Sequence, residues 1–247
     1  RDYPADTKAA EGPETERGVG TLYVVLDDVG YHTQNLKLFL QLPIPITFAV
    51  LPKLPDTTVA VELIDSAGSE YILHQPMEPI GKEDPGPGAL TTKMSKRKVR
   101  EVLSENLKDL PNAHGINNHM GSKLTSDPKL MDEVLALLGE RKLFFLDSRT
   151  TADTVAEDVA REHRVAFTER NVFLDNESTE PYILDALEEG TRIADEKGYA
   201  VLIGHVWSRE LYEVLEDRYD ELQERGYSFG YITDLFRRET VYAGARN

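Results

Sequence analysis

Two adjacent aspartates, Asp27 and Asp28, end the apolar run from Leu22 to Leu26 and are closely followed by Gly30. A run of that length without polar alternation is typical of a strand buried on both faces of a parallel sheet. The carboxylates must lie where the strand meets solvent, because burying them unpaired is costly. That edge is where α/β folds collect catalytic groups. The pair therefore predicts a chemical site at the carboxyl ends of the strands.

Four further apolar runs end in a histidine, an amide or an acid. These are 71–73 before His74, 115–116 before Asn117, Asn118 and His119, 143–146 before Asp147, and 200–203 before Gly204 and His205. One polar residue after a strand is usually the start of a loop. Five strands that end in this way indicate one shared site.

Asp28, His74 and His119 are the residues that we expect to bind a divalent metal, with zinc as the expected ion. One carboxylate oxygen and two imidazole nitrogens leave positions open for water and substrate. Thiolate ligands are excluded because the chain contains no cysteine. Such an ion makes hydroxide available near neutral pH or polarises a carbonyl group. The set therefore predicts hydrolytic chemistry.

Asp27 and His205 are the candidates for proton transfer. Side chains alternate along a strand, so Asp27 should point away from Asp28. The turn into Gly30 can still bring both carboxylates to one mouth, where Asp27 is free to act as a base. His205, from another strand, can protonate the leaving group. We interpret the remaining histidines as structural or surface residues: His32, His114 and His163.

Other chemistries have less support. The chain has no Gly-x-Ser-x-Gly elbow, Walker A loop, Gly-x-Gly-x-x-Gly fingerprint or His-Glu-x-x-His motif. A glycoside hydrolase pair of Asp27 or Asp28 with Glu78 rests on residue type alone. A metal-dependent phosphoesterase is disfavoured because few basic side chains lie near the proposed site.

Composition narrows the class of protein. The 247 residues are 40% hydrophobic, which supports a sizeable core, and the net charge of −16 disfavours binding to nucleic acid or anionic membranes. No apolar run is long enough to span a membrane. Residues 1–19 are polar and predict a flexible linker, left after removal of a signal peptide or anchor. This implies an extracytoplasmic location, although a cloning boundary would give the same start.

Alternating patterns predict the fold. Strands are expected at 21–27, 45–51, 70–74, 114–119, 143–147, 164–168, 199–204 and 227–232. Helices are expected between them, including 56–68, 127–139 and 208–226. This order favours a single β/α barrel over residues 20–240, with a tail at 241–247, and a doubly wound open sheet is the alternative. The long loop at 75–92 should form a wall of the cleft.

The motif-bearing segments resemble the divergent polysaccharide deacetylase family. The segments are 26–30, 74–79, 115–122, 145–148 and 203–205, in the expected order. The resemblance implies a distorted β/α barrel of about seven strands and a metal-dependent carbohydrate esterase that removes acetyl groups. It also implies that Asp27 is the base, Asp28 a metal ligand and His205 the acid. We expect residues of the same segments to contact the carbohydrate substrate: Glu78, Asn118, Ser122 and Asp147.

The chain departs from other deacetylases of this superfamily. Their two metal-binding histidines share one helical His-Ser/Thr-x-x-x-His-like motif, whereas His74 and His119 come from separate strands. Their Arg-x-Pro-Tyr motif and late Asp-Trp element are absent, and no proline follows His205. The leading hypothesis is thus a metal-dependent deacetylase of an envelope glycan, and the rival is a catalytically inactive envelope binding protein with the same barrel.

Overall fold

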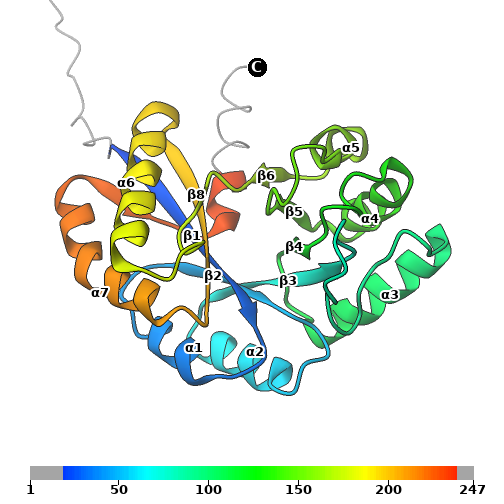
Figure 1. Cartoon of the computed structure of the whole chain (residues 1–247), viewed down its shortest axis with the longest axis horizontal. Coiled ribbons are helices and arrows are strands. Elements are labelled where there is room, and N and C mark those ends of the chain that lie inside the picture. Colours follow the sequence, from blue (N-terminus) through cyan, green and yellow to red (C-terminus); the bar gives the residue numbers. More distant parts are fainter. Residues whose placement is uncertain (1–18, 238–247) are drawn as a thin grey trace, which may run out of the picture.

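Strands and helices alternate along most of the chain in the computed structural model, which describes residues 19–237, and β6 and β7 alone follow each other directly within that range (Figure 1). The strands are β1 (Gly20–Val29), β2 (Ile46–Val50), β3 (Glu70–Met77), β4 (Gly115–Met120), β5 (Phe144–Asp147), β6 (Phe167–Glu169), β7 (Val172–Phe173), β8 (Tyr199–His205) and β9 (Tyr227–Phe229). The helices are α1 (Gln34–Phe39), α2 (Thr57–Ser66), α3 (Lys96–Asp109), α4 (Pro128–Arg141), α5 (Ala156–His163), α6 (Glu180–Lys197) and α7 (Arg209–Glu224). The expected tail, and the expected linker except for Val19, lie outside the described residues.

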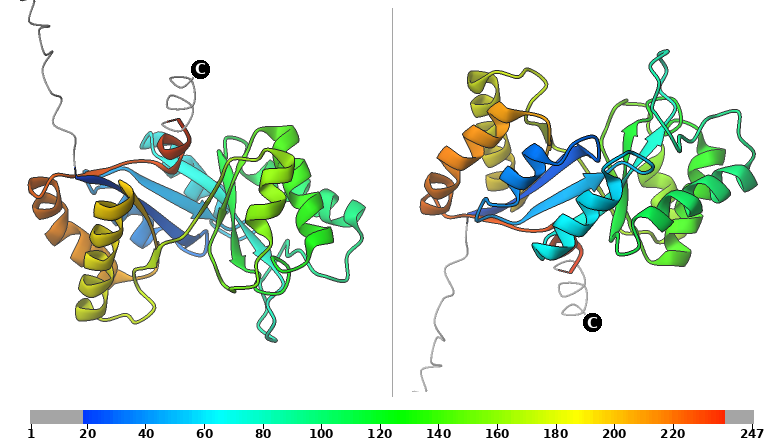
Figure 2. Two further views of the ribbon diagram at one scale, coloured as in Figure 1. Left: turned by 90° about the horizontal axis from the view of Figure 1, so that it is seen from above. Right: turned by 90° about the horizontal axis from the view of Figure 1, so that it is seen from below.

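All nine strands pair in parallel in one curled sheet, whose main order is β6-β5-β4-β3-β2-β1-β8-β7. β9 pairs with the first residues of β1, before β2 begins to pair at Val24. Helices surround the curled sheet (Figure 2). Within residues 19–237 no ladder joins β6 to β7, so the barrel is open between its two edge strands. The expected α/β class and distorted barrel are confirmed.

Both faces of β1 are buried because the barrel wall separates two apolar cores. Leu22, Val24 and Leu26 belong to an outer core between the sheet and the helices. The inner core lies on the other face of the sheet and contains Tyr23, Val25, Ala49, Ile72, Phe144, Leu146, Val201, Ile203, Ile232 and Leu235. The uninterrupted apolar run of β1 thus consists of two alternating sets of side chains. The same alternation decides which polar residues reach the barrel interior.

Some element boundaries differ from the sequence prediction. β3 continues to Met77 rather than ending at His74, and it remains paired with β4 over this extension. Gly139 does not end α4, which continues to Arg141 because Lys142 is the residue that takes the left-handed conformation, at φ 59°. β7 was not expected, because a two-residue strand gives no periodic signal.

The predicted cap of α4 is confirmed, and the predicted start of α7 is also capped by a side chain. Asp127 Oδ1 accepts hydrogen bonds from the backbone N–H groups of Lys129 and Leu130, at 2.9 and 3.2 Å. Ser208 Oγ accepts from the backbone N–H of Leu211 at 3.2 Å, at the start of α7. Within the described range, no helix is long and apolar enough to cross a bilayer.

Candidate active site

The alternation of the strands directs polar side chains to the inner face at one edge of the barrel. On three strands the residue two positions after an inner-core residue is polar: Asp27 after Val25, His74 after Ile72, and His205 after Ile203. On β4 the outer-core residue Ile116 leaves Asn117 and His119 on the inner face. Parallel pairing then brings these strand ends side by side, because Asp27 is in register with His205 and His74 with Asn117.

Asp28 reaches the same site through its backbone conformation. Its position in the strand alternates with that of Asp27, but its φ of 64° is in the left-handed region. The register of β1 against β2 also shifts between Leu26 and Val29. Asp28 is therefore the carboxylate that is turned inward, whereas Asp27 follows the regular strand. A non-glycine residue in this region is strained by roughly 1–3 kcal/mol and is often found at functional sites.

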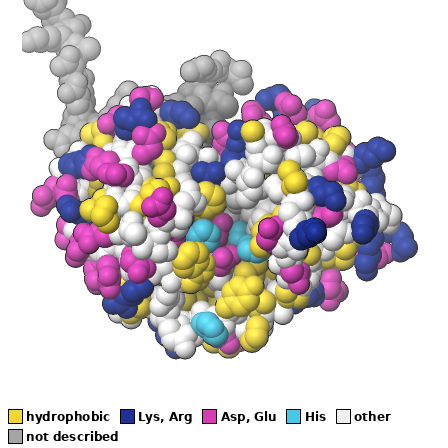
Figure 3. Space-filling model, in the orientation of Figure 1, with side chains coloured by type: hydrophobic (Ala, Val, Ile, Leu, Met, Phe, Trp, Pro, Cys, Tyr) yellow, Lys and Arg dark blue, Asp and Glu magenta, His cyan; other side chains and the backbone are white. Residues whose placement is uncertain are grey.

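Three ligand atoms converge at the mouth of the barrel. Asp28 Oδ1 lies 3.4 Å from His74 Nε2 and 3.1 Å from His119 Nδ1, and the two nitrogens are 3.1 Å apart. Ligands about 2.0–2.2 Å from a tetrahedral zinc ion lie roughly 3.3–3.6 Å from one another. These three atoms thus have nearly the spacing of a tetrahedral set with a fourth position left open. Histidine side chains gather at the middle of this face of the molecule (Figure 3).

Asn117 determines which nitrogen of His74 is available to a metal. The Asn117 amide nitrogen donates to Asp27 Oδ1 at 2.8 Å, so its oxygen is the atom that faces His74 Nδ1 at 2.7 Å. His74 Nδ1 must therefore donate, which leaves a lone pair on Nε2 in the neutral ring. An outer partner of this kind usually orients a metal-binding histidine.

A cation fits the site better than a hydrogen-bond network does. Within the described residues Asp28 Oδ1 is buried without a hydrogen bond of normal geometry. Burial raises the pKa of Asp28, but the two imidazoles outweigh this effect and hold the pKa well below its usual range. Burial also opposes a charge on His74, whereas Asp27 and Asp28 raise its pKa. A divalent ion bound by Asp28, His74 and His119 would supply the positive charge that balances the buried carboxylates, so that the imidazoles could remain neutral.

Asp27 is a buried carboxylate that is held in one orientation. Apart from the amide of Asn117 it faces His74, whose Nε2 is 3.6 Å from Asp27 Oδ2. Burial raises the pKa of Asp27, although His74 and His205 act against this shift. A raised pKa favours a carboxylate that accepts a proton during reaction.

His205 is paired with Asp175, a residue that the sequence analysis missed. Asp175 accepts from the backbone N–H of His205 at 2.8 Å and faces its Nδ1 at 2.9 Å. Burial alone lowers the pKa of His205, but the hydrogen bond and charge of Asp175 raise it to about 9. His205 is thus protonated near neutral pH. The signal for Asp175 was present, since it ends the short run 172–174, but that run is too short to stand out.

A stack of planar groups supports His205. Trp207 lies on one side with ring centroids 4.8 Å apart, and Phe173 stacks on His205 at 5.7 Å. The guanidinium of Arg170 covers Phe173 at 4.1 Å and donates to the backbone carbonyl of Ser148. Such stacks hold flat side chains in one orientation. Neither Trp207 nor Arg170 was predicted as a site residue from the sequence.

The four residues expected to contact substrate make hydrogen bonds within the protein, Asn118 from β4, Asp147 from β5, and Glu78 and Ser122 from loops. The Glu78 carboxylate accepts from Lys123 Nζ and from Thr92, which lowers its pKa to about 2. Glu78 is therefore unsuited to be the acid of a glycoside hydrolase pair.

Ser122, Asn118 and Asp147 also make internal hydrogen bonds. Ser122 Oγ accepts from the backbone N–H of Ile80, which joins the long loop to the segment after β4. Asn118 Oδ1 accepts from the backbone N–H of Ser148, and buried Asp147 accepts from Arg149 N–H and Thr154 Oγ1. Contact of these four residues with substrate stays a prediction.

The family of the chain follows from a sequence comparison. The divergent polysaccharide deacetylase family model matches residues 24–236. The chain belongs to this family. Two relatives are 34% identical to it: an uncharacterised protein of Haemophilus influenzae, over 184 residues, and the uncharacterised protein YibQ of Escherichia coli, over 186 residues. The aligned parts cover 74% and 75% of the chain but only 66% and 58% of these relatives.

Solved structures confirm the deacetylase fold. An uncharacterised protein from Agrobacterium tumefaciens superposes with a TM-score of 0.82 at 22% identity, over 91% of this chain and 92% of the other. A CE4 family pseudoenzyme from Bacillus anthracis gives 0.56 at 14% identity, over 87% and 64%. A family 4 carbohydrate esterase from Streptomyces lividans in complex with acetate gives 0.52 at 12% identity, over 88% and 93%. The fold thus occurs both in esterases and in pseudoenzymes of the CE4 family.

Proposed function

We propose that this protein is a metal-dependent hydrolase that removes acetyl groups from an envelope polysaccharide or a related glycan, in an extracytoplasmic compartment. The observation that carries the proposal is the convergence of Asp28, His74 and His119 beside a buried carboxylate and a protonated histidine. Membership of the deacetylase family supports an acetylated carbohydrate as the substrate.

Different residues of the site have different roles in the proposed hydrolysis. Asp28, His74 and His119 would hold a divalent ion, zinc in our proposal, and a bound ion of this kind supplies Lewis acidity toward the acetyl carbonyl and the attacking water. Asp27 accepts the proton of that water, and Asn117 keeps its carboxylate oriented. His205 donates a proton to the leaving amine or alcohol.

A zinc titration of chelator-treated protein tests the metal site. We expect His74→Ala and His119→Ala to weaken zinc binding by at least about 100-fold, since each removes a ligand of a three-residue set. His163→Ala is the matched control, because this histidine pairs with Asp132 at the surface. Zinc binding by both variants at the parental affinity would show that the site lies elsewhere.

A second candidate is a catalytically inactive envelope protein that binds a glycan through the same barrel. The likeness to a CE4 family pseudoenzyme favours it. Acetate release from a panel of acetylated glycans distinguishes the two functions, provided that the assayed protein has been shown to contain metal. Release that is lost in Asp27→Asn, with zinc affinity unchanged, supports the hydrolase. No release from any glycan by the metal-loaded protein supports the binding protein.

A further inference from the structure

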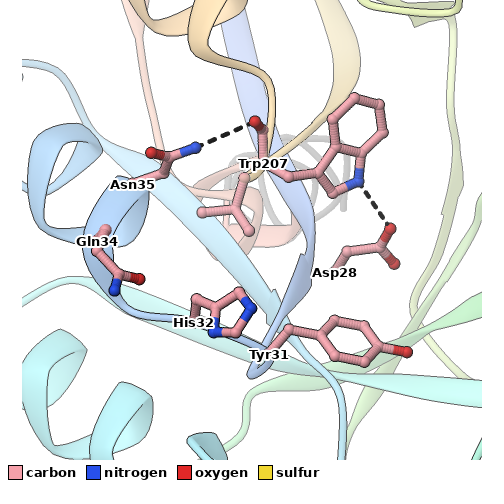
Figure 4. Close-up of a pocket in the computed structure, with 7 residues that line it drawn as sticks. Asp28, Tyr31, His32, Gln34, Asn35 and Trp207 are labelled. Atoms are coloured by element: carbon pink, nitrogen blue, oxygen red, sulfur yellow. Dashed lines mark hydrogen bonds between the residues drawn. The ribbon is translucent and has the colours of Figure 1, made fainter.

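A cavity of about 170 Å³ lies beside Asp28, between the first β–α connection and the segment after β8. Its lining residues are Asp28, Tyr31, His32, Gln34, Asn35, Val206 and Trp207 (Figure 4). Drug-sized ligands occupy roughly 300–1,000 Å³. A smaller cavity next to the reactive centre therefore suits a single ring of a larger substrate.

One wall of the cavity is a rigid tryptophan. Trp207 Nε1 donates to Asp28 Oδ2 at 3.1 Å, and its backbone carbonyl accepts from Asn35 Nδ2 at 3.0 Å. Its indole also stacks on His205, yet Trp207 is still 50% exposed. An aromatic face that is fixed before binding lowers the entropy lost when a ligand stacks on it.

The facing wall combines a second aromatic ring with unpaired polar groups. Tyr31 is also 50% exposed, and Figure 4 shows Trp207 and Tyr31 on either side of the Asp28 carboxylate. In the part of the chain that the structure describes, the side chains of Tyr31, His32 and Gln34 have no hydrogen-bond partner. They are therefore free to pair with ligand hydroxyl groups.

The charge of the cavity selects against acidic ligands. None of the described residues that line it is a lysine or an arginine. The whole chain also carries a net charge of −16. A uronate or phosphorylated sugar would thus enter without a cationic partner, which is unfavourable.

We propose that this cavity binds one neutral pyranose ring of the glycan, next to the sugar that carries the acetyl group, between Trp207 and Tyr31. Gln34 and His32 pair with its hydroxyl groups. The inference rests on the proposed function for the class of substrate, but it assigns residues that take no part in the proton transfers. Tyr31, His32 and Gln34 become determinants of glycan specificity.

Intrinsic fluorescence provides the test, because Trp207 is the only tryptophan in the chain. The chelator-treated protein is titrated with chitotriose, cellotriose and xylotriose as neutral probes and with trigalacturonate as the acidic probe. We expect at least one neutral trisaccharide to change the emission saturably, and trigalacturonate to leave it unchanged. Tyr31→Ala should weaken that binding about tenfold, whereas Tyr31→Phe should keep it, since the ring is retained.

Gln34→Ala should also weaken binding, whereas Lys37→Ala, an exposed position on the same helix, should not. The proposal is overturned if no neutral trisaccharide changes the emission, if trigalacturonate binds as tightly, or if Tyr31→Ala binds like the parent.

These outcomes can be distinguished from a failure of the proposed function. Saturable binding without acetate release contradicts the hydrolase alone, whereas acetate release with Tyr31→Ala binding like the parent contradicts the cavity alone.

Discussion

Replacing Asp175 by asparagine should shift the ionisation of His205. Asp175 is buried and its carboxylate is the main group that raises the pKa of His205 from 6.5 to about 9. This shift corresponds to about 3 kcal/mol of interaction, as an upper bound, because the His205 side chain is 22% exposed. Without the carboxylate, burial lowers the pKa instead. We therefore expect the Asp175→Asn protein to have a His205 pKa at or below the ordinary value of 6.5.

The same pair sets a pH dependence of stability. The pKa of His205 is higher in the folded protein than in the unfolded chain. The stabilisation of the folded protein by the His205–Asp175 pair is therefore fully present below pH 6.5 and is lost as the pH rises through about 9. In the parent, loss of the His205 proton should lower the free energy of unfolding by up to about 3 kcal/mol as the pH rises across that interval. The Asp175→Asn protein should lack this decrease.

The fluorescence of Trp207 can be used to measure the ionisation of His205. A protonated imidazole quenches a stacked indole more strongly than a neutral one, so Trp207 emission of chelator-treated protein should rise as His205 loses its proton. The expected midpoint is near pH 9 in the parent. His205→Gln should abolish the transition, and Asp185→Asn, at an exposed aspartate, should leave it in place. A midpoint near 9 that persists in Asp175→Asn would refute the role of this carboxylate.

Three further substitutions test how the site is supported. Asn117→Ala removes the amide between the proposed base and a proposed metal ligand, and it should weaken zinc binding about 10–100-fold in a chelator competition. Unchanged affinity would mean that the amide does not orient the ligand. Gly115→Ala should cost about 1–3 kcal/mol in denaturant unfolding, because its Cβ would lie 2.5 Å from the Phe144 ring. Asp127→Ala should cost about 0.5–2 kcal/mol through loss of the α4 cap, whereas exposed Asp153→Ala should cost less, and equal losses would argue against the cap.

The elements that could be predicted from the sequence are those whose signals are local. Three such signals are the apolar run of β1, the capping aspartate of α4 and the glycine after α7. Each acts within a few residues, so it can be recognised from the sequence alone. The grouping of Asp28, His74 and His119 was also predictable, because parallel strands end at the same edge.

The remaining features depend on contacts between distant segments. The backbone conformation that turns Asp28 inward leaves no trace in residue type. Asn117 acquires its role only when β4 lies beside β3. Asp175 follows a two-residue strand that exists because β8 pairs with it. Glu78 is a plausible ligand by type, but its carboxylate is occupied by Lys123 from another loop.

Side chains along each strand alternate between the inner and outer faces of the barrel, and this has a consequence for how sequences of this kind can be recognised. Asp27, His74 and His205 each lie two positions after an inner-core residue, and Asn117 and His119 lie two positions apart on the inner face of β4, although the five residues share no common spacing along the chain. For these five residues, parity within the strand rather than a fixed motif length brings the side chain to the inner face, whereas Asp28 reaches it through its left-handed backbone. Insertions in the loops leave that parity intact, whereas a one-residue slip within a strand reverses it. A search for a histidine pair on one helix would pass over this chain, but a search for polar residues of one parity at successive strand ends would find it.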